Sequence, residues 1–171
     1  MLKVAVILSG CGVFDGAEIH ESVLTFLALE EQGAEYQCFA PDIKQHHVIN
    51  HITGEEMEGS RNVLIESARI CRGNILPINK LNTHQYDALI LPGGFGAAKN
   101  LSNFAFKGQH SHIEPSVLFA TQSFAKINKP VGFICIAPAL IPLIYGKAVE
   151  LTIGSDQETA DTIEAMGGTH I

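Results

Sequence analysis

The sequence predicts an α/β fold, a doubly wound and mostly parallel sheet with helices on both faces. Short apolar runs rich in β-branched residues alternate with longer stretches of helical spacing, which is typical of strand-helix-strand units. The first run, 4–8, has no polar alternation, as expected for a strand covered on both faces. A length of 171 residues with 46% hydrophobic and 17% charged residues fits one folded domain, expected over 1–171.

In the first half of the chain, a helical pattern over 22–31 follows the first strand and precedes a second strand over 36–40. The stretch from 42 to 83 is less regular. We expect it to decorate the edge of the sheet, with a short strand over 47–52 and a helix over 61–72.

In the second half, a strand over 87–91 ends at Pro-Gly-Gly, and a helix is expected over 114–127. A strand over 131–135 then runs directly into a helical pattern over 136–145. The last expected elements are a strand near 149–153, a helix over 156–166 and, at 169–171, the start of a strand without a partner. In such a sheet, binding sites lie beyond the carboxyl ends of the strands.

Composition excludes several classes of partner. The net charge is −7 and no basic run is present, so we expect no nucleic-acid or membrane partner. The longest apolar candidate, 131–146, is shorter than the about 20 residues of a membrane span and is interrupted by Pro138 and Pro142, so no span is expected. The apolar run ending at Leu8 is too short for a signal peptide, so we expect none. The four cysteines are widely spaced, so we expect free thiols and a cytoplasmic protein.

Cys135 stands where the buried strand 131–135 meets the next helical pattern, the context of a nucleophile elbow. The N–H groups at the start of a helix favour a thiolate. A small buried cysteine at a strand end is the alternative, and the spacing alone leaves both open.

A glycine-rich segment follows the strand over 87–91 and contains Gly93 and Gly94. Glycines at a strand end can present backbone N–H groups to a developing oxyanion, although an ordinary turn has the same composition. The segment is not a phosphate loop, because Lys99 lacks the required spacing and a following Ser or Thr.

The segment after the first strand carries carboxylates ahead of, or within, the first helical turn. A carboxyl group close to a thiolate can serve as a proton shuttle, although acids also gather at helix starts to complement the dipole. For Glu18 alone the second explanation is preferred. Gly10, Gly12 and Gly16 resemble a loose dinucleotide fingerprint, but Asp15 stands where the tighter pattern requires Gly or Ala.

The eight histidines do not have metal-ligand spacing, so no metal site is expected. No histidine follows Cys135 directly, and therefore a Cys-His pair adjacent in sequence is absent.

Together these motifs resemble the ElbB-like proteins, isoprenoid-biosynthesis proteins with an amidotransferase-like domain. Their superfamily includes the intracellular protease PfpI, the parkinsonism-linked deglycase and the class I glutamine amidotransferases. The matching segments cover nearly the whole chain: 6–21, 48–55, 61–66, 91–105 and 132–139.

The resemblance implies a class I glutamine amidotransferase-like, flavodoxin-like sandwich and a set of site residues. Cys135 matches the reactive cysteine, and the N–H groups of Gly94 and Ile136 match the oxyanion-hole donors. Glu21 matches the carboxyl that hydrogen-bonds the cysteine, with Glu18 as the fallback.

The resemblance further implies a glyoxalase-like enzyme that converts small dicarbonyls such as glyoxal to hydroxy acids without a cofactor or metal, acting as a homodimer. The alternative is a noncatalytic regulatory or oxidation-sensing protein linked to isoprenoid biosynthesis. Ile136 stands where hydrolytic relatives have His, which argues against protease and glutaminase activity. Family members extend past Ile171, so we expect the last elements of the domain to be missing.

Overall fold

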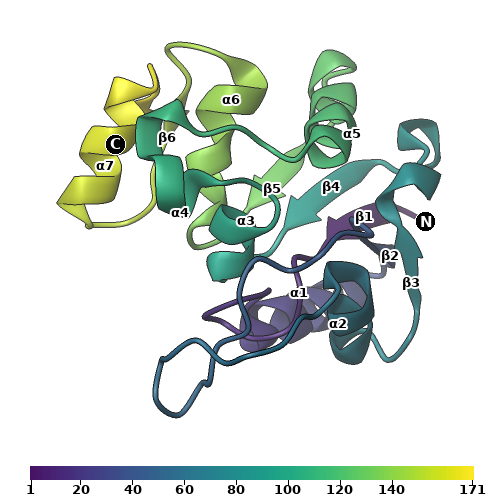
Figure 1. Cartoon of the computed structure of the whole chain (residues 1–171). Coiled ribbons are helices and arrows are strands. Elements are labelled where there is room, and N and C mark those ends of the chain that lie inside the picture. The colour runs from purple at the N-terminus through teal and green to yellow at the C-terminus, as the bar shows by residue number, and fades with distance from the viewer.

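A five-stranded parallel sheet forms the centre of the computed structural model, which describes residues 1–171 (Figure 1). The strand order β3-β2-β1-β4-β5 confirms the doubly wound fold class. The strands are β1 (Lys3–Ile7), β2 (Glu35–Ala40), β3 (Ile75–Pro77), β4 (Ala88–Leu91) and β5 (Val131–Phe133).

Helices cover both faces of this sheet. Figure 1 shows α1 (Ile19–Glu31) and α2 (Val63–Ile70) on one face, with α5 (Pro115–Lys126) and α6 (Ile141–Tyr145) on the other. Strand β1 serves both layers because alternate side chains point to opposite faces. Ala5 and Ile7 pack in the core under α5, whereas Val4, Val6 and Leu8 pack with Phe26 of α1.

The segment 42–83 differs from its expected structure in two ways. Residues 47–52 form no strand, since Ile49 makes only an isolated bridge with Glu56. The segment also contributes β3, a core edge strand that the sequence pattern missed because it is three residues long. The expected helix begins at Val63, where the Asn62 side chain caps it by accepting the Ile65 N–H.

The expected helix over 136–145 is divided into a 3₁₀ turn, η4 (Ala137–Leu140), and α6. Pro138 and Pro142 account for the division, because each lacks the N–H that a continuous helix requires. The strand expected at 169–171 has a partner after all: β7 (Thr169–His170) pairs with β6 (Glu150–Leu151). The remaining elements are η1 (Ile78–Lys80), η2 (Thr83–Gln85), α3 (Phe95–Lys99), α4 (Phe104–Lys107), η3 (Gly108–His110) and α7 (Gln157–Ala165).

The strand order places the ends of three strands together. The chain turns to one side of β1 to form β2 and β3, and to the other side to form β4 and β5. The segments after β1, β4 and β5 therefore meet at one edge, the position where sheets of this type bind ligands. None of the helices is long and apolar enough to cross a membrane.

Candidate active site

Cys135 occupies a sharp turn after β5. Its backbone has a φ of 60°, in the left-handed region that a residue with a Cβ seldom adopts. The turn is closed by two hydrogen bonds, from the Ile134 N–H to the Leu91 carbonyl and from the Ala137 N–H to the Ile134 carbonyl, both at 3.0 Å. The residue is exposed, so the strained turn presents the thiol at the surface.

Glu21, in the first turn of α1, lies against this thiol. Its Oε2 accepts the N–H of Gly93 at 2.8 Å. A Cβ on Gly93 would overlap Cys135 Cβ and lie 2.7 Å from Glu21 Oε2. Gly93 therefore lets the carboxylate and the thiol approach each other, and substitution there would separate them.

Two backbone donors face the sulfur, the N–H groups of Gly94 and Ile136. The loop that carries Gly94 is fixed by the segment after β1. The Phe95 N–H donates to the Val13 carbonyl at 2.7 Å, and the Glu18 N–H donates to the Gly93 carbonyl at 2.9 Å. The two donors are thus held in place before any ligand binds, as an oxyanion hole requires.

The surroundings of Cys135 raise the pKa of its thiol. Although the residue as a whole is exposed, its thiol is partly shielded from water, and this partial burial is the largest cause of the shift. The Glu21 carboxylate adds to it, whereas the N–H groups of Gly94 and Ile136 oppose the shift and are outweighed. The two N–H groups thus favour the thiolate, as expected, but the net direction of the pKa is upward. A short 3₁₀ turn, and not a long helix, follows Cys135, so only these two N–H groups oppose burial and the neighbouring carboxylate.

Glu18 has a different role from Glu21. It is the N-cap of α1, and its Oε2 accepts the Glu21 N–H at 2.6 Å while Oε1 lies 3.0 Å from His20 Nδ1. Burial alone would raise the pKa of Glu18, but these contacts hold it below its ordinary value. The structure thus brings Glu21 to the thiol and leaves Glu18 to position the start of the helix that carries Glu21.

The glycines after β1 do not form a phosphate-binding loop. The Gly10 N–H donates to Ser67 Oγ at 2.9 Å, the Gly12 N–H to the Ala17 carbonyl at 2.9 Å, and the Gly16 N–H to the Gly12 carbonyl at 2.7 Å. A pyrophosphate site needs such donors to be free. The interpretation of this loop as a dinucleotide site is therefore not supported, and its donors serve the packing of the loop.

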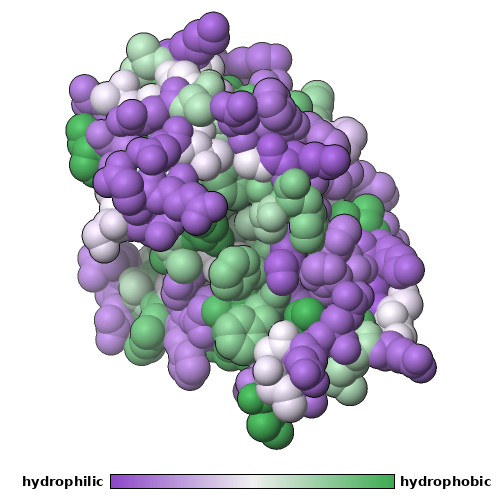
Figure 2. Space-filling model, turned by 60° about the vertical axis from the view of Figure 1, so that its left-hand side comes forward, coloured by the Kyte–Doolittle hydropathy of each residue, from purple (hydrophilic) through white to green (hydrophobic).

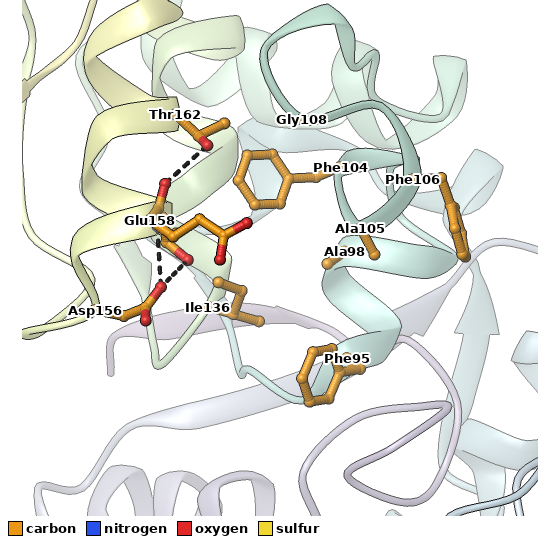
Figure 3. A pocket seen from close by; sticks show the side chains of 11 residues that line it. Phe95, Ala98, Phe104, Ala105, Phe106, Gly108, Ile136, Asp156, Glu158 and Thr162 are labelled. Carbon is orange, nitrogen blue, oxygen red and sulfur yellow. Dashed lines mark hydrogen bonds between the residues drawn. The ribbon is translucent and has the colours of Figure 1, made fainter.

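A cavity of about 430 Å³ adjoins the elbow and was not anticipated from the sequence. Two of its lining residues are neighbours of the site in the chain: Phe95 follows Gly94, and Ile136 follows Cys135. Figure 2 shows apolar residues gathered in a hollow on this face, with hydrophilic residues around it. The cavity's lining comprises Phe95, Ala98, Phe104, Ala105, Phe106, Gly108, Ile136, Asp156, Glu158, Thr159 and Thr162 (Figure 3).

Residues 3–152 match the model of the DJ-1/PfpI family. The chain belongs to the DJ-1/PfpI family. It is 47% identical over 178 residues to the human (Homo sapiens) protein named "Glutamine amidotransferase-like class 1 domain-containing protein 3, mitochondrial", covering 98% of this chain and 66% of the relative. The "ES1 protein, mitochondrial" of Danio rerio is 34% identical, with 98% of this chain and 68% of the relative covered. This DJ-1/PfpI chain thus spans about two thirds of the length of these curated relatives.

Solved structures of related proteins share this fold. An isoprenoid biosynthesis protein with an amidotransferase-like domain from Ehrlichia chaffeensis is 40% identical and has a TM-score of 0.93; the match covers all of this chain and 78% of that one. Drosophila melanogaster DJ-1beta is 16% identical and has a TM-score of 0.57; the match covers 99% of this chain and 73% of that one. This likeness supports the fold alone.

Proposed function

We propose that this chain is a glyoxalase-like enzyme of the ElbB-like branch, which converts glyoxal and similar dicarbonyls to hydroxy acids without a cofactor. One observation carries the proposal: a thiol, a carboxylate and two backbone donors converge at the elbow through Cys135, Glu21, Gly94 and Ile136. Nucleophile, base and oxyanion donors in mutual reach are the parts that carbonyl addition requires.

The first step is addition of the thiol to one aldehyde. The Cys135 sulfur forms a bond to the carbonyl carbon as Glu21 removes the thiol proton, and the resulting oxyanion lies at the N–H groups of Gly94 and Ile136. A raised pKa of Cys135 suits this role for Glu21, because a protonated thiol requires a base at the moment of attack. Proton return to the oxyanion gives a hemithioacetal.

The second step is an isomerisation. A carboxylate within reach removes the proton from the hemithioacetal carbon, giving an enediol, and returns a proton to the neighbouring carbon. The product is the thioester of glycolate with Cys135. Water then adds to the thioester carbonyl, releasing glycolate and the free thiol. We assign both proton transfers to Glu21, because the carboxylate of Glu18 is occupied by the helix start.

The experiment follows glycolate formation from glyoxal by the purified chain and by Cys135→Ala. The exposed position of Cys135 predicts that the variant folds, which circular dichroism checks. Turnover should be lost in the variant. Equal rates for the two proteins would remove Cys135 from the reaction and with it the proposal.

A second candidate function, oxidation sensing at Cys135, is favoured by the exposure of this thiol. Its raised pKa opposes it, because oxidation proceeds through the thiolate. Sensing predicts that dilute peroxide oxidises Cys135 before Cys11, Cys38 and Cys71, as mapped by peptide mass spectrometry. Uniform oxidation would count against it.

We also propose that the enzyme is a cytoplasmic homodimer. The outward face of α1 exposes Val23, Leu24 and Leu27 to between 46% and 60%, together with Ile19. A contiguous apolar stripe of this kind is what a second copy of the chain would cover. Four free thiols agree with a reducing compartment. Light scattering tests the assembly, and cell fractionation tests the compartment.

A further inference from the structure

The cavity beside the elbow has one apolar wall and one acidic wall. The apolar wall consists of Phe95, Phe104 and Ile136 with small residues between them, and the acidic wall is the first half of α7. Ile136 and Phe95 directly follow Cys135 and Gly94 in the chain, so the apolar wall begins at the residues next to the thiol and to one of its backbone donors. A volume of about 430 Å³ lies in the range of about 300–1,000 Å³ that holds ligands much larger than glyoxal.

The two carboxylates of the acidic wall differ in their partners. Asp156 is the N-cap of α7, with Oδ2 accepting the Thr159 N–H at 2.9 Å and the Thr159 hydroxyl at 2.6 Å. The Glu158 carboxylate has no hydrogen bond or ion pair, and only its backbone carbonyl is used, by the hydroxyl of Thr162 at 2.9 Å. Figure 3 shows this free carboxylate pointing into the cavity, between Phe104 and Ile136.

No Lys, Arg or His lines the cavity, so nothing within it neutralises Glu158. Of the three phenylalanines in the lining, Phe104 lies beside Glu158 in Figure 3. The ring of Phe95 already has Lys99 Nζ 5.2 Å from its centroid, and the ring of Phe106 stacks on His46. Aromatic faces attract ammonium groups, and a carboxylate adds a direct charge partner. An anionic group placed beside Glu158 would meet a second carboxylate, that of Asp156, and no cation among the lining residues.

We propose that this cavity binds the cationic end of the substrate, and that the enzyme therefore prefers aldehydes or dicarbonyls bearing a protonated amine on a short alkyl chain. The carbonyl end lies at Cys135, the alkyl chain lies along Phe95 and Ile136, and the ammonium group pairs with Glu158. The inference rests on the proposed function only in taking Cys135 as the group that reacts with the carbonyl.

The test measures the charge preference at Cys135 without any turnover. Aminoethyl and sulfonatoethyl methanethiosulfonate each transfer a thioalkyl group to the cysteine, forming a mixed disulfide and releasing methanesulfinate. The ratio of their rates at the Cys135 peptide, read by mass spectrometry, reports the preference for cation over anion. The structure predicts that Glu158→Gln lowers this ratio by about threefold at low salt, and that the loss shrinks as salt rises.

Glu164→Gln is the matched control, because Glu164 is exposed on the same helix and does not line the cavity. It should leave the ratio unchanged. A ratio that Glu158→Gln does not alter, or that both variants alter equally, would overturn the inference.

A second measurement uses n-butylammonium chloride as the probe. It should slow the alkylation of wild-type Cys135 by neutral iodoacetamide, whereas n-butanol at the same concentration and ionic strength should not. Equal protection by the two probes would contradict a cation site. If glyoxal turnover fails while the charge preference persists, the proposed reaction is wrong and the cavity assignment stands.

Discussion

Replacing Glu21 by Gln should increase the reactivity of Cys135 and at the same time destroy turnover. In the wild type the Gly93 N–H donates to Glu21 Oε2 at 2.8 Å. The Gln side-chain oxygen can accept the same hydrogen bond, so the loop should keep its position. The negative charge is lost, however, and both its repulsion and its hydrogen bond raise the pKa of Cys135. The pKa of the thiol should therefore fall in the variant.

Turnover should fall by about 10²–10⁴-fold, the usual contribution of a general acid-base group. This corresponds to about 3–5 kcal/mol of barrier at 1.36 kcal/mol for each factor of ten. Iodoacetamide alkylation of Cys135 as a function of pH measures the first effect, and glycolate formation measures the second. Glu31→Gln, an exposed carboxylate at the other end of α1, serves as the control and should change neither quantity. Faster alkylation with full turnover would show that Glu21 transfers no proton, and slower alkylation would refute the assigned cause of the raised pKa.

Three further predictions concern stability and assembly. Gly94→Ala should lower the free energy of unfolding, measured with urea, by about 2 kcal/mol or more. The reason is that the φ of Gly94 is 91° and a Cβ there would lie 2.5 Å from the Gly16 carbonyl oxygen. An unchanged free energy of unfolding would contradict this crowding. Glu18→Ala should cost about 1 kcal/mol at pH 7. The pKa of Glu18 in the folded protein lies below its ordinary value of 4.5, so the loss of stability in Glu18→Ala should persist down to about pH 4.5 and disappear as the pH falls through the folded pKa. A loss of stability that does not depend on pH would argue against a charged cap. Leu24→Lys should convert a dimer to a monomer in light scattering, and a monomeric wild type would refute pairing through α1.

The sequence was most informative where an apolar run ends at glycine, proline or cysteine. The segments 87–91 and 131–135 are apolar runs that stop at Pro-Gly-Gly and at Cys135, so the oxyanion loop and the elbow could both be located. The edge strand β3 could not, because three residues carry no periodicity. The division of 136–145 could have been inferred from Pro138 and Pro142, since each breaks a helical hydrogen bond.

Which carboxylate meets the thiol depended on tertiary contacts. Glu18 and Glu21 are both near the start of α1. Glu21 is the one that faces Cys135, because its carboxylate accepts the N–H of Gly93, the glycine that lies against the cysteine. The pKa of the thiol was likewise out of reach, since it depends on burial and on a residue more than a hundred positions away. The residues that line the cavity come from α3, α4, α7 and the turn before η4, which are far apart in the sequence, so no local sequence pattern could predict it.

Trapping the covalent intermediate would show directly whether Cys135 is the nucleophile. Wild-type enzyme mixed with glyoxal is quenched at short intervals, digested, and the Cys135 peptide is weighed by mass spectrometry. The mechanism predicts one glyoxal-derived adduct on Cys135 that forms and decays as fast as glycolate is released. Glycolate release without an adduct on this peptide, or an adduct that outlasts many turnovers, would contradict Cys135 as the nucleophile.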